Sequence, residues 1–207
     1  MKICGITQPQ QGNAIAQLGA SALGFVCVRR SPRYINPHDI RDIVEALPGK
    51  VDRVGVFANS TESEICQVAT TAKLTAIQLH GDESPQFCDR LREQLPGFKI
   101  IKAFRVKSPE TLDTIAAYTD SIDMALLDAY HPQQLGGTGR TIDPNLLQQF
   151  RCPRPWLLAG GLTPDNVVEA LTLVKPNGID LSSGVEVAPG NKDLNLVAAL
   201  FDRLQQW

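Results

Sequence analysis

The chain has 207 residues, of which 43% are hydrophobic and 20% are charged, a composition typical of one globular domain that spans residues 1–207. Its 20 basic and 22 acidic side chains give a formal charge of −2, which argues against a protein that binds nucleic acid mainly through charge. No apolar run approaches the roughly 20 residues of a membrane span, and the first residues lack the apolar segment of a secretory signal, so we expect a cytoplasmic protein with no membrane partner.

Short apolar segments alternate with segments of helical periodicity along the whole chain. The alternation predicts eight strands, at 2–5, 23–28, 51–57, 75–79, 98–104, 124–128, 155–159 and 178–181. A helix is predicted after each strand, at 9–19, 37–47, 61–72 and 84–95, beginning near 108, 143 and 163, and at 194–204. Thr61 with Glu64 predicts a capping box, and Ser84 before Pro85 predicts a helix start.

Strands that alternate with helices indicate right-handed βαβ units and a parallel sheet. Eight such units in about 200 residues are near the smallest size of a (β/α)8 barrel, known as a TIM barrel. The alternative is a doubly wound open sheet, which often carries a G-x-G-x-x-G turn after its first strand. The segment C-G-I-T at 4–7 lacks that pattern. The sequence therefore predicts an α/β fold of the closed-barrel kind.

Five cysteines are present, at positions 4, 27, 66, 88 and 152. The number is odd and no two have the spacing of a metal knuckle, so we expect free thiols rather than a disulfide framework or a structural zinc site. Cys4 is set apart because it ends the first predicted strand, where the chemistry of a barrel is found. The alternative interpretation of Cys4 is an inert buried thiol.

Two further side chains that can carry protons end predicted strands. Asp128 follows the apolar run M-A-L-L at 124–127, surroundings that favour a protonated carboxyl able to act as an acid. A salt-bridged or helix-capping aspartate would show the same pattern. His80 follows the fourth strand and is interpreted as an acid, a base or a packed polar residue. Arg33, held in its loop by Pro32, could fork onto a carboxylate or remain a solvated surface residue.

Small residues follow the seventh and eighth strands. Gly160 and Gly161 come after one, and Ser183 and Gly184 after the other. Because backbone N–H groups in such loops bind anions, and barrels often hold phosphate there, we predict a phosphate site, with plain tight turns as the alternative. The glycine-rich segment 136–140 fails the P-loop pattern, and we interpret 129–141 as either a lid or an ordinary loop.

Motifs at the strand ends occur in a characteristic order. They are K-I-C-G-I at 2–6, G-F-V at 24–26, S-P-R-Y-I at 31–35, R-V-G-V-F at 53–57, Q-L-H-G at 78–81, L-L-D at 126–128, G-G-T-G at 136–139, A-G-G-L at 159–162 and D-L-S-S-G-V-E at 180–186. Together they closely resemble the phosphoribosylanthranilate isomerases of tryptophan biosynthesis, and they cover the chain from residue 2 to the last helix.

The resemblance implies an isomerase that performs an Amadori rearrangement of its small-molecule substrate, phosphoribosylanthranilate. It implies Cys4 as the general base, Asp128 as the general acid and Arg33 as the residue that holds the anthranilate carboxylate. The phosphate would lie against the loops of Gly160, Gly161, Ser183 and Gly184. His80 and Asp180 match polar residues that line the pocket. The family uses no metal and no organic cofactor.

Other functions of a phosphate-binding barrel fit these residues less well. A ribulose-phosphate epimerase would be expected to bind metal through histidines at strand ends, which the three histidines at 38, 80 and 131 fit poorly. An indole-glycerol-phosphate synthase would be expected to use Lys and Glu where this chain has Cys and Asp. A barrel that binds a phosphate ligand without catalysis is the alternative outside the enzymes. We expect a monomer, with a homodimer as the alternative, because no sustained exposed apolar stripe is evident.

Overall fold

The structure is a computed structural model that describes residues 1–129, 142, 146–147 and 150–206. Two expectations lie outside the described residues: the helix start near 143 and the glycine-rich segment 136–140 with its proposed lid. In the described part of the chain, no helix is long and apolar enough to cross a membrane.

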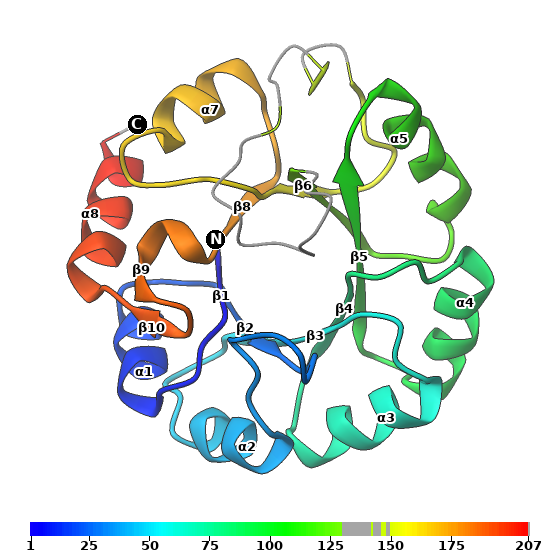
Figure 1. Cartoon of the computed structure of the whole chain (residues 1–207), viewed down its shortest axis with the longest axis horizontal. Coiled ribbons are helices and arrows are strands. Elements are labelled where there is room, and N and C mark those ends of the chain that lie inside the picture. Colours follow the sequence, from blue (N-terminus) through cyan, green and yellow to red (C-terminus); the bar gives the residue numbers. More distant parts are fainter. Residues whose placement is uncertain (130–141, 143–145, 148–149, 207) are drawn as a thin grey trace.

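Eight parallel strands form a closed barrel in the order of the sequence, as Figure 1 shows in a view into the ring of strands. The strands are β1 (Lys2–Cys4), β2 (Ala22–Val26), β3 (Asp52–Phe57), β4 (Ala76–Leu79), β5 (Lys99–Val106), β6 (Met124–Ala129), β7 (Trp156–Leu158) and β8 (Gly178–Leu181). The barrel closes where β1 pairs with β8 and Lys2 lies opposite Asp180. The closed barrel is confirmed, and the open sheet is excluded.

Helices surround the barrel as an outer ring (Figure 1). Those with described bounds are α1 (Pro9–Gln17), α2 (Pro37–Glu45), α3 (Glu62–Thr71), α4 (Pro85–Gln94), α5 (Pro109–Asp113), α7 (Val167–Leu173) and α8 (Leu194–Gln205), and a 3-10 turn, η1 (Thr114–Tyr118), continues α5. The predicted capping box of Thr61 and Glu64 is present at α3. The cap at Ser84 is present as well, because its hydroxyl accepts a hydrogen bond from the Phe87 N–H.

The predicted start of the seventh helix near 163 is wrong, since α7 begins at Val167. The side-chain oxygen of Asn166 accepts the Thr163 N–H at 2.8 Å, and the Thr163 hydroxyl accepts the Asp165 N–H at 3.3 Å. These bonds stabilise a turn over 163–166, as Asn and Thr side chains commonly do where they compete with helix formation. The helix therefore starts after the turn.

The alternation of side chains along each strand separates two apolar clusters. Val54, Ala76, Ile101, Leu126 and other small or branched residues fill the inside of the barrel. The intervening residues of the same strands pack outward against the helices in a larger cluster. Because successive side chains of a strand point to opposite faces, a residue two positions after an inward one points inward as well. This period brings the polar residues at the strand ends to the mouth of the barrel.

The hairpin after β8 was not predicted. After β8 the chain forms a 3-10 turn, η2 (Ser183–Val185), and then a two-stranded hairpin, β9 (Glu186–Ala188) and β10 (Asn191–Lys192). Gly190 has φ +80°, a left-handed conformation that glycine adopts without strain. The side chain of Gln11 in α1 bonds both the N–H and the carbonyl of Lys192 and fixes the hairpin to the barrel. The hairpin thereby carries Glu186 and Lys192 to the end of β1.

Candidate active site

A cavity of about 760 Å³ lies at the carboxyl ends of the strands. Every residue proposed for the site from the sequence lines it: Cys4, Arg33, His80, Asp128, Gly160, Gly161, Asp180, Ser183 and Gly184. These residues come from six of the eight strands or the loops that follow them, so only a closed barrel can assemble them. The cavity is therefore the candidate active site.

His80 and Asp128 form the proton-carrying pair on one wall. Asp128 lies two positions after the inward Leu126, and His80 two positions after Gln78, so both reach the mouth. The Gln78 amide Nε2 lies 2.9 Å from His80 Nδ1. With that amide donating, the proton of a neutral imidazole is on Nε2, which lies 3.3 Å from Asp128 Oδ2. The contact is not aligned as a hydrogen bond, so His80 Nε2 has no such partner among the described residues.

The loop that carries His80 is held by a buried ion pair behind the barrel wall. Lys102 Nζ lies 3.2 Å from Glu83 Oε2 and donates to the carbonyls of Leu79 and Gly81, which flank His80 in the sequence. Both charged side chains are at most 4% exposed. Because a buried charge requires partners in a fixed geometry, this pair fixes the loop and with it the position of His80.

Cys4 lies beside a second buried ion pair. Lys2, two positions earlier on β1, donates to both carboxyl oxygens of Asp180 at 2.9 Å. Burial lowers the pKa of Lys2, but the charges of Asp180 and Cys4 outweigh burial and raise that pKa, so Lys2 remains protonated. Burial raises the pKa of the Cys4 thiol, and the positive charge of Lys2 is the largest influence that opposes it.

A third network fixes the guanidinium that was expected to hold a carboxylate. Arg33 Nε donates to Glu186 Oε1 at 3.0 Å, and its Nη2 donates to Oε2 at 2.7 Å. Glu186 Oε1 also lies 2.7 Å from Lys192 Nζ. Burial raises the pKa of Glu186, but the hydrogen bonds from Arg33 and the charge of Lys192 outweigh burial and leave that pKa below its usual value. Arg33 thus lines the cavity while its Nε and Nη2 are bonded to Glu186.

The loops after β7 and β8 touch each other. A Cβ on Gly184 would come within 1.8 Å of the Leu162 carbonyl oxygen, so only glycine permits this approach. Gly160 and Gly161 have φ +89° and +61°, which turn the backbone back toward the cavity. In the described part of the chain, the N–H groups of Gly160, Gly161, Ser183 and Gly184 donate no hydrogen bond. Four free backbone donors beside one cavity are suited to an anion.

Asn166 braces one of these loops from behind. Its side-chain oxygen accepts the Thr163 N–H, and its side-chain nitrogen donates to the Gly161 carbonyl at 2.9 Å. That bond ties Gly161 to the residue that immediately precedes α7. The turn at 163–166, which precedes α7, therefore also fixes the Gly161 backbone at the expected phosphate site.

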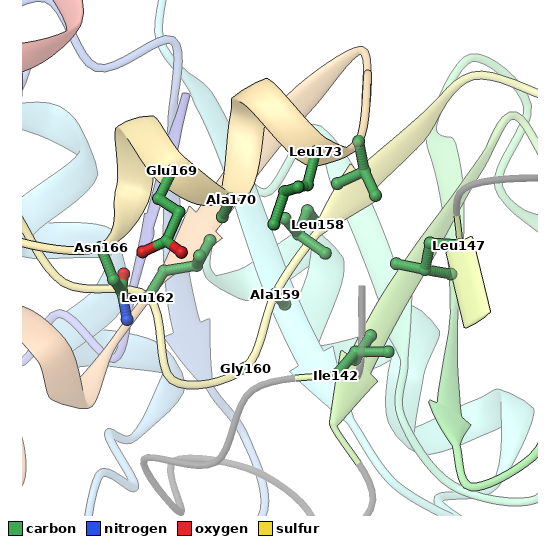
Figure 2. A pocket seen from close by; sticks show the side chains of 11 residues that line it. Ile142, Leu147, Leu158, Ala159, Gly160, Leu162, Asn166, Glu169, Ala170 and Leu173 are labelled. Atoms are coloured by element: carbon green, nitrogen blue, oxygen red, sulfur yellow. The ribbon is translucent and has the colours of Figure 1, made fainter. Parts of the chain in front are cut away.

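A smaller cavity of about 220 Å³ lies between β7 and α7 (Figure 2). Figure 2 shows Leu158, Leu162 and Leu173 along it, with Asn166 and Glu169 near one end. Its described lining is apolar apart from these two, and it contains no pair of an acid and a base. The larger cavity is the one with the groups for chemistry.

Lys2, Glu186 and Lys192 were not selected from the sequence. Lys2 and Glu186 stand inside the motifs K-I-C-G-I and D-L-S-S-G-V-E, so a signal was present, but nothing in it identified their partners. Among the described residues, no group of three or more His, Cys, Asp or Glu side chains is arranged to hold a metal ion.

The chain is similar in sequence and in fold to known proteins. The family described as "N-(5'phosphoribosyl)anthranilate (PRA) isomerase" matches residues 1–203. The N-(5'-phosphoribosyl)anthranilate isomerase of Gloeothece citriformis is 57% identical over 207 residues, which cover 100% of this chain and 94% of that protein. A solved structure of monomers generated from the dimeric enzyme of Thermotoga maritima has TM-score 0.87 at 35% identity, covering 100% of this chain and 98% of that one. A second solved structure has the same TM-score, identity and coverage. It is a phosphoribosyl anthranilate isomerase in complex with reduced 1-(o-carboxyphenylamino)-1-deoxyribulose 5-phosphate.

Proposed function

The chain belongs to the N-(5'-phosphoribosyl)anthranilate isomerase family and is an aldose–ketose isomerase of tryptophan biosynthesis, and we propose that Cys4 and Asp128 carry out its reaction as general base and general acid. The observation that carries this assignment is that a thiol, a carboxyl group, a guanidinium and free backbone donors line one cavity. The substrate has matching groups, because phosphoribosylanthranilate carries a phosphate at one end and a carboxylate at the other.

The first step opens the sugar ring. The protonated Asp128 carboxyl gives its proton to the furanose oxygen while the C1′–O bond breaks, and the anthranilate nitrogen supplies the electron pair that forms an iminium. The His80 Nε2–H lies 3.3 Å from Asp128 Oδ2, and a rotation of either side chain would align it to donate to the carboxylate that this step leaves. Proton transfer by a positioned group contributes about 10²- to 10⁴-fold to the rate.

The second step moves a proton within the open chain. The Cys4 thiolate takes the proton from C2′, which the adjacent iminium acidifies, and an enolamine forms. Return of that proton from Cys4 to C1′ and loss of the enol proton to Asp128 give the amino ketone. Both groups are then back in their starting states, so the net change is an isomerisation. The iminium itself accepts the electrons of the broken C–H bond.

The ends of the substrate are held by the two kinds of anion site. The loops of Gly160, Gly161, Ser183 and Gly184 are suited to the phosphate through their backbone donors. Arg33 is suited to the carboxylate, because Glu186 occupies its Nε and Nη2 and fixes the plane of the guanidinium, whose remaining nitrogen is Nη1. Two held ends keep C2′ near Cys4 during both proton transfers.

The test follows the fluorescence of phosphoribosylanthranilate, which falls as the substrate is consumed. The wild-type chain is expected to turn it over, and Cys4→Ser and Asp128→Asn are expected to lose nearly all turnover while still binding the reduced product analogue. If the wild type binds the analogue but does not consume the substrate, the chain is a phosphate-binding barrel without catalysis. Full turnover by Cys4→Ser would remove the thiol from the mechanism.

We also propose that residues 1–207 fold as one domain, that the protein is a monomer, and that it acts in the cytoplasm, where a biosynthetic enzyme finds its substrates. Few large apolar side chains are exposed among the described residues, and apart from Val187 none is more than 41% exposed, which favours a monomer: Leu18, Leu173, Val187, Leu194 and Leu196. Light scattering of the eluted protein measures the mass, and a value of twice the chain mass would establish the homodimer.

A further inference from the structure

Lys2 is among the largest fully buried side chains of the protein, with 2% of its surface exposed. It lies on β1 beneath Cys4 and does not line the candidate active site itself. A buried ammonium requires anionic partners, because its separation from water is costly. An apolar residue would pack at this position without that cost, so the charge calls for a functional explanation.

The geometry directs this charge at Cys4. Lys2 and Cys4 are two positions apart on one strand and therefore share the inward face. The neighbouring strand has Gly24 in register with Cys4, and a Cβ there would lie 2.6 Å from Cys4 Sγ and 3.0 Å from Lys2 Nζ. The thiol and the ammonium thus meet over the one position of β2 that has no side chain.

The hydrogen-bond count of Lys2 leads to the same conclusion. An ammonium has three donors. Two are accepted by the oxygens of Asp180 at 2.9 Å each, and among the described residues the third has no further oxygen or nitrogen acceptor, so it is available to the Cys4 sulfur that shares the space over Gly24. Lys2 therefore bridges a fixed carboxylate and the thiol that is proposed as the base.

We propose that Lys2 is a positioning residue that stabilises the thiolate of Cys4, and that Asp180 holds Lys2 in place and weakens its effect. The inference rests on the proposed function of Cys4 as the base. A thiolate is needed because the thiol itself cannot take a proton from carbon. A protonated lysine beside the thiolate opposes the effect of burial on the pKa of Cys4, because the ion pair offsets part of the cost of burying the negative charge.

Other charged or titratable groups face Cys4 from neighbouring elements. Lys192 of β10 also opposes the burial of the thiolate, but its ammonium is 2.7 Å from Glu186 Oε1 and within 3.5 Å of both Ser182 oxygens. Its charge is therefore largely balanced by Glu186. Cys27, just after β2, has a pKa raised by burial to about 12 and stays neutral. Arg33 is paired with Glu186, which leaves Lys2 and Asp180 as the pair that controls Cys4.

The experiment measures how fast iodoacetamide alkylates Cys4 as a function of pH, with mass spectrometry separating Cys4 from the other four cysteines. Lys2→Met is expected to raise the pH midpoint of Cys4 alkylation by about one to three units, since an opposite charge at this range shifts a pKa by that amount. Asp180→Asn is expected to lower the midpoint, because the thiolate then becomes the anionic partner of Lys2. The double variant should have a higher midpoint than Asp180→Asn alone, and this comparison remains available if Lys2→Met does not fold.

Lys102→Met is the matched control, because Lys102 is a buried lysine paired with Glu83 on the outer side of the wall. It should leave the Cys4 midpoint unchanged. The proposal would be overturned if the Cys4 midpoint moved in the same direction in Lys2→Met and Asp180→Asn, or did not move. A purely structural role of the pair would not shift the midpoint in opposite directions in the two variants. The base role of Cys4 is tested separately: an active Cys4→Ser enzyme would refute that role and leave the measured coupling of Lys2 and Cys4 in place.

Discussion

Replacing Glu186 by Gln tests the network that holds Arg33. The Glu186 side chain is 4% exposed, and it serves two cations, Arg33 at 13% and Lys192 at 0% exposure. The substitution keeps the shape and removes the shared negative charge, which leaves the buried Lys192 and the partly buried Arg33 without a counter-ion. Breaking a buried pair in this way costs about 3–5 kcal/mol, or about 6–20 °C in the melting temperature of a chain of this size.

Glu45→Gln is a matched control for that measurement. Glu45 also contacts two cations, Arg41 at 2.9 Å and Lys73 at 2.6 Å, but its side chain is 46% exposed. Exposed pairs contribute little because water screens them, so this variant should melt at nearly the same temperature as the wild type. Equal losses of stability in Glu186→Gln and Glu45→Gln would refute the argument that burial makes the network strong.

Glu186→Gln should also change the kinetics of the enzyme. Without the Glu186 carboxylate, the Nε and Nη2 of Arg33 lose their charged partner. The substrate must then fix the position of the Arg33 side chain when it binds. Re-ordering one long side chain costs roughly 0.5–1.5 kcal/mol, which corresponds to a KM raised about 2- to 10-fold with kcat less affected. Steady-state rates from the fluorescence assay measure both constants. A fall in kcat with an unchanged KM would mean that Glu186 acts on the chemistry and not on Arg33.

The pH dependence of stability follows from the pKa of Glu186. Burial raises that pKa, but Arg33 and Lys192 leave it below its usual value in the folded protein. A depressed carboxyl pKa stabilises the fold above the unfolded pKa, and the contribution is lost as the pH falls through the folded pKa. The difference in unfolding free energy between wild type and Glu186→Gln should therefore be constant above about pH 5 and shrink in more acidic solution. A difference that grows toward low pH would contradict the assignment.

Further predictions concern the groups around the substrate. Cys4→Ser and Asp128→Asn should each lower kcat by about 10²- to 10⁴-fold, measured by fluorescence, with the affinity for the reduced product analogue retained; a large loss of affinity would indicate damage to the pocket instead. Arg33→Ala should mainly raise KM, and a change confined to kcat would assign the carboxylate to another residue. Gly184→Ala should weaken binding of inorganic phosphate in a calorimeter and lower stability, because its Cβ would overlap the Leu162 carbonyl at 1.8 Å; unchanged phosphate binding would place the anion elsewhere.

Most of the fold could be predicted because its signals are local. The strand and helix alternation needs only the period of the apolar residues, and the capping box at α3 needs only Thr61 and Glu64. The start of α7 was mispredicted because Thr163 and Asn166 use their side chains to stabilise a turn, and a proline after threonine is equally common at a helix start. The β9–β10 hairpin was missed because its strands have three and two residues, too few for a periodic pattern.

By itself, the sequence determined which residues reach the mouth of the barrel. Cys4, His80 and Asp128 each end a strand, and parallel strands that alternate with helices bring their carboxyl ends together. Only the tertiary structure decided which charges meet there. Lys2 and Asp180 are 178 positions apart, and Arg33 and Glu186 are 153 apart. The first pair forms where β1 joins β8, and the second where the hairpin after β8 reaches the loop after β2. Burial then sets how strongly these charges act on each other, and burial is a property of the closed barrel rather than of any segment of the chain.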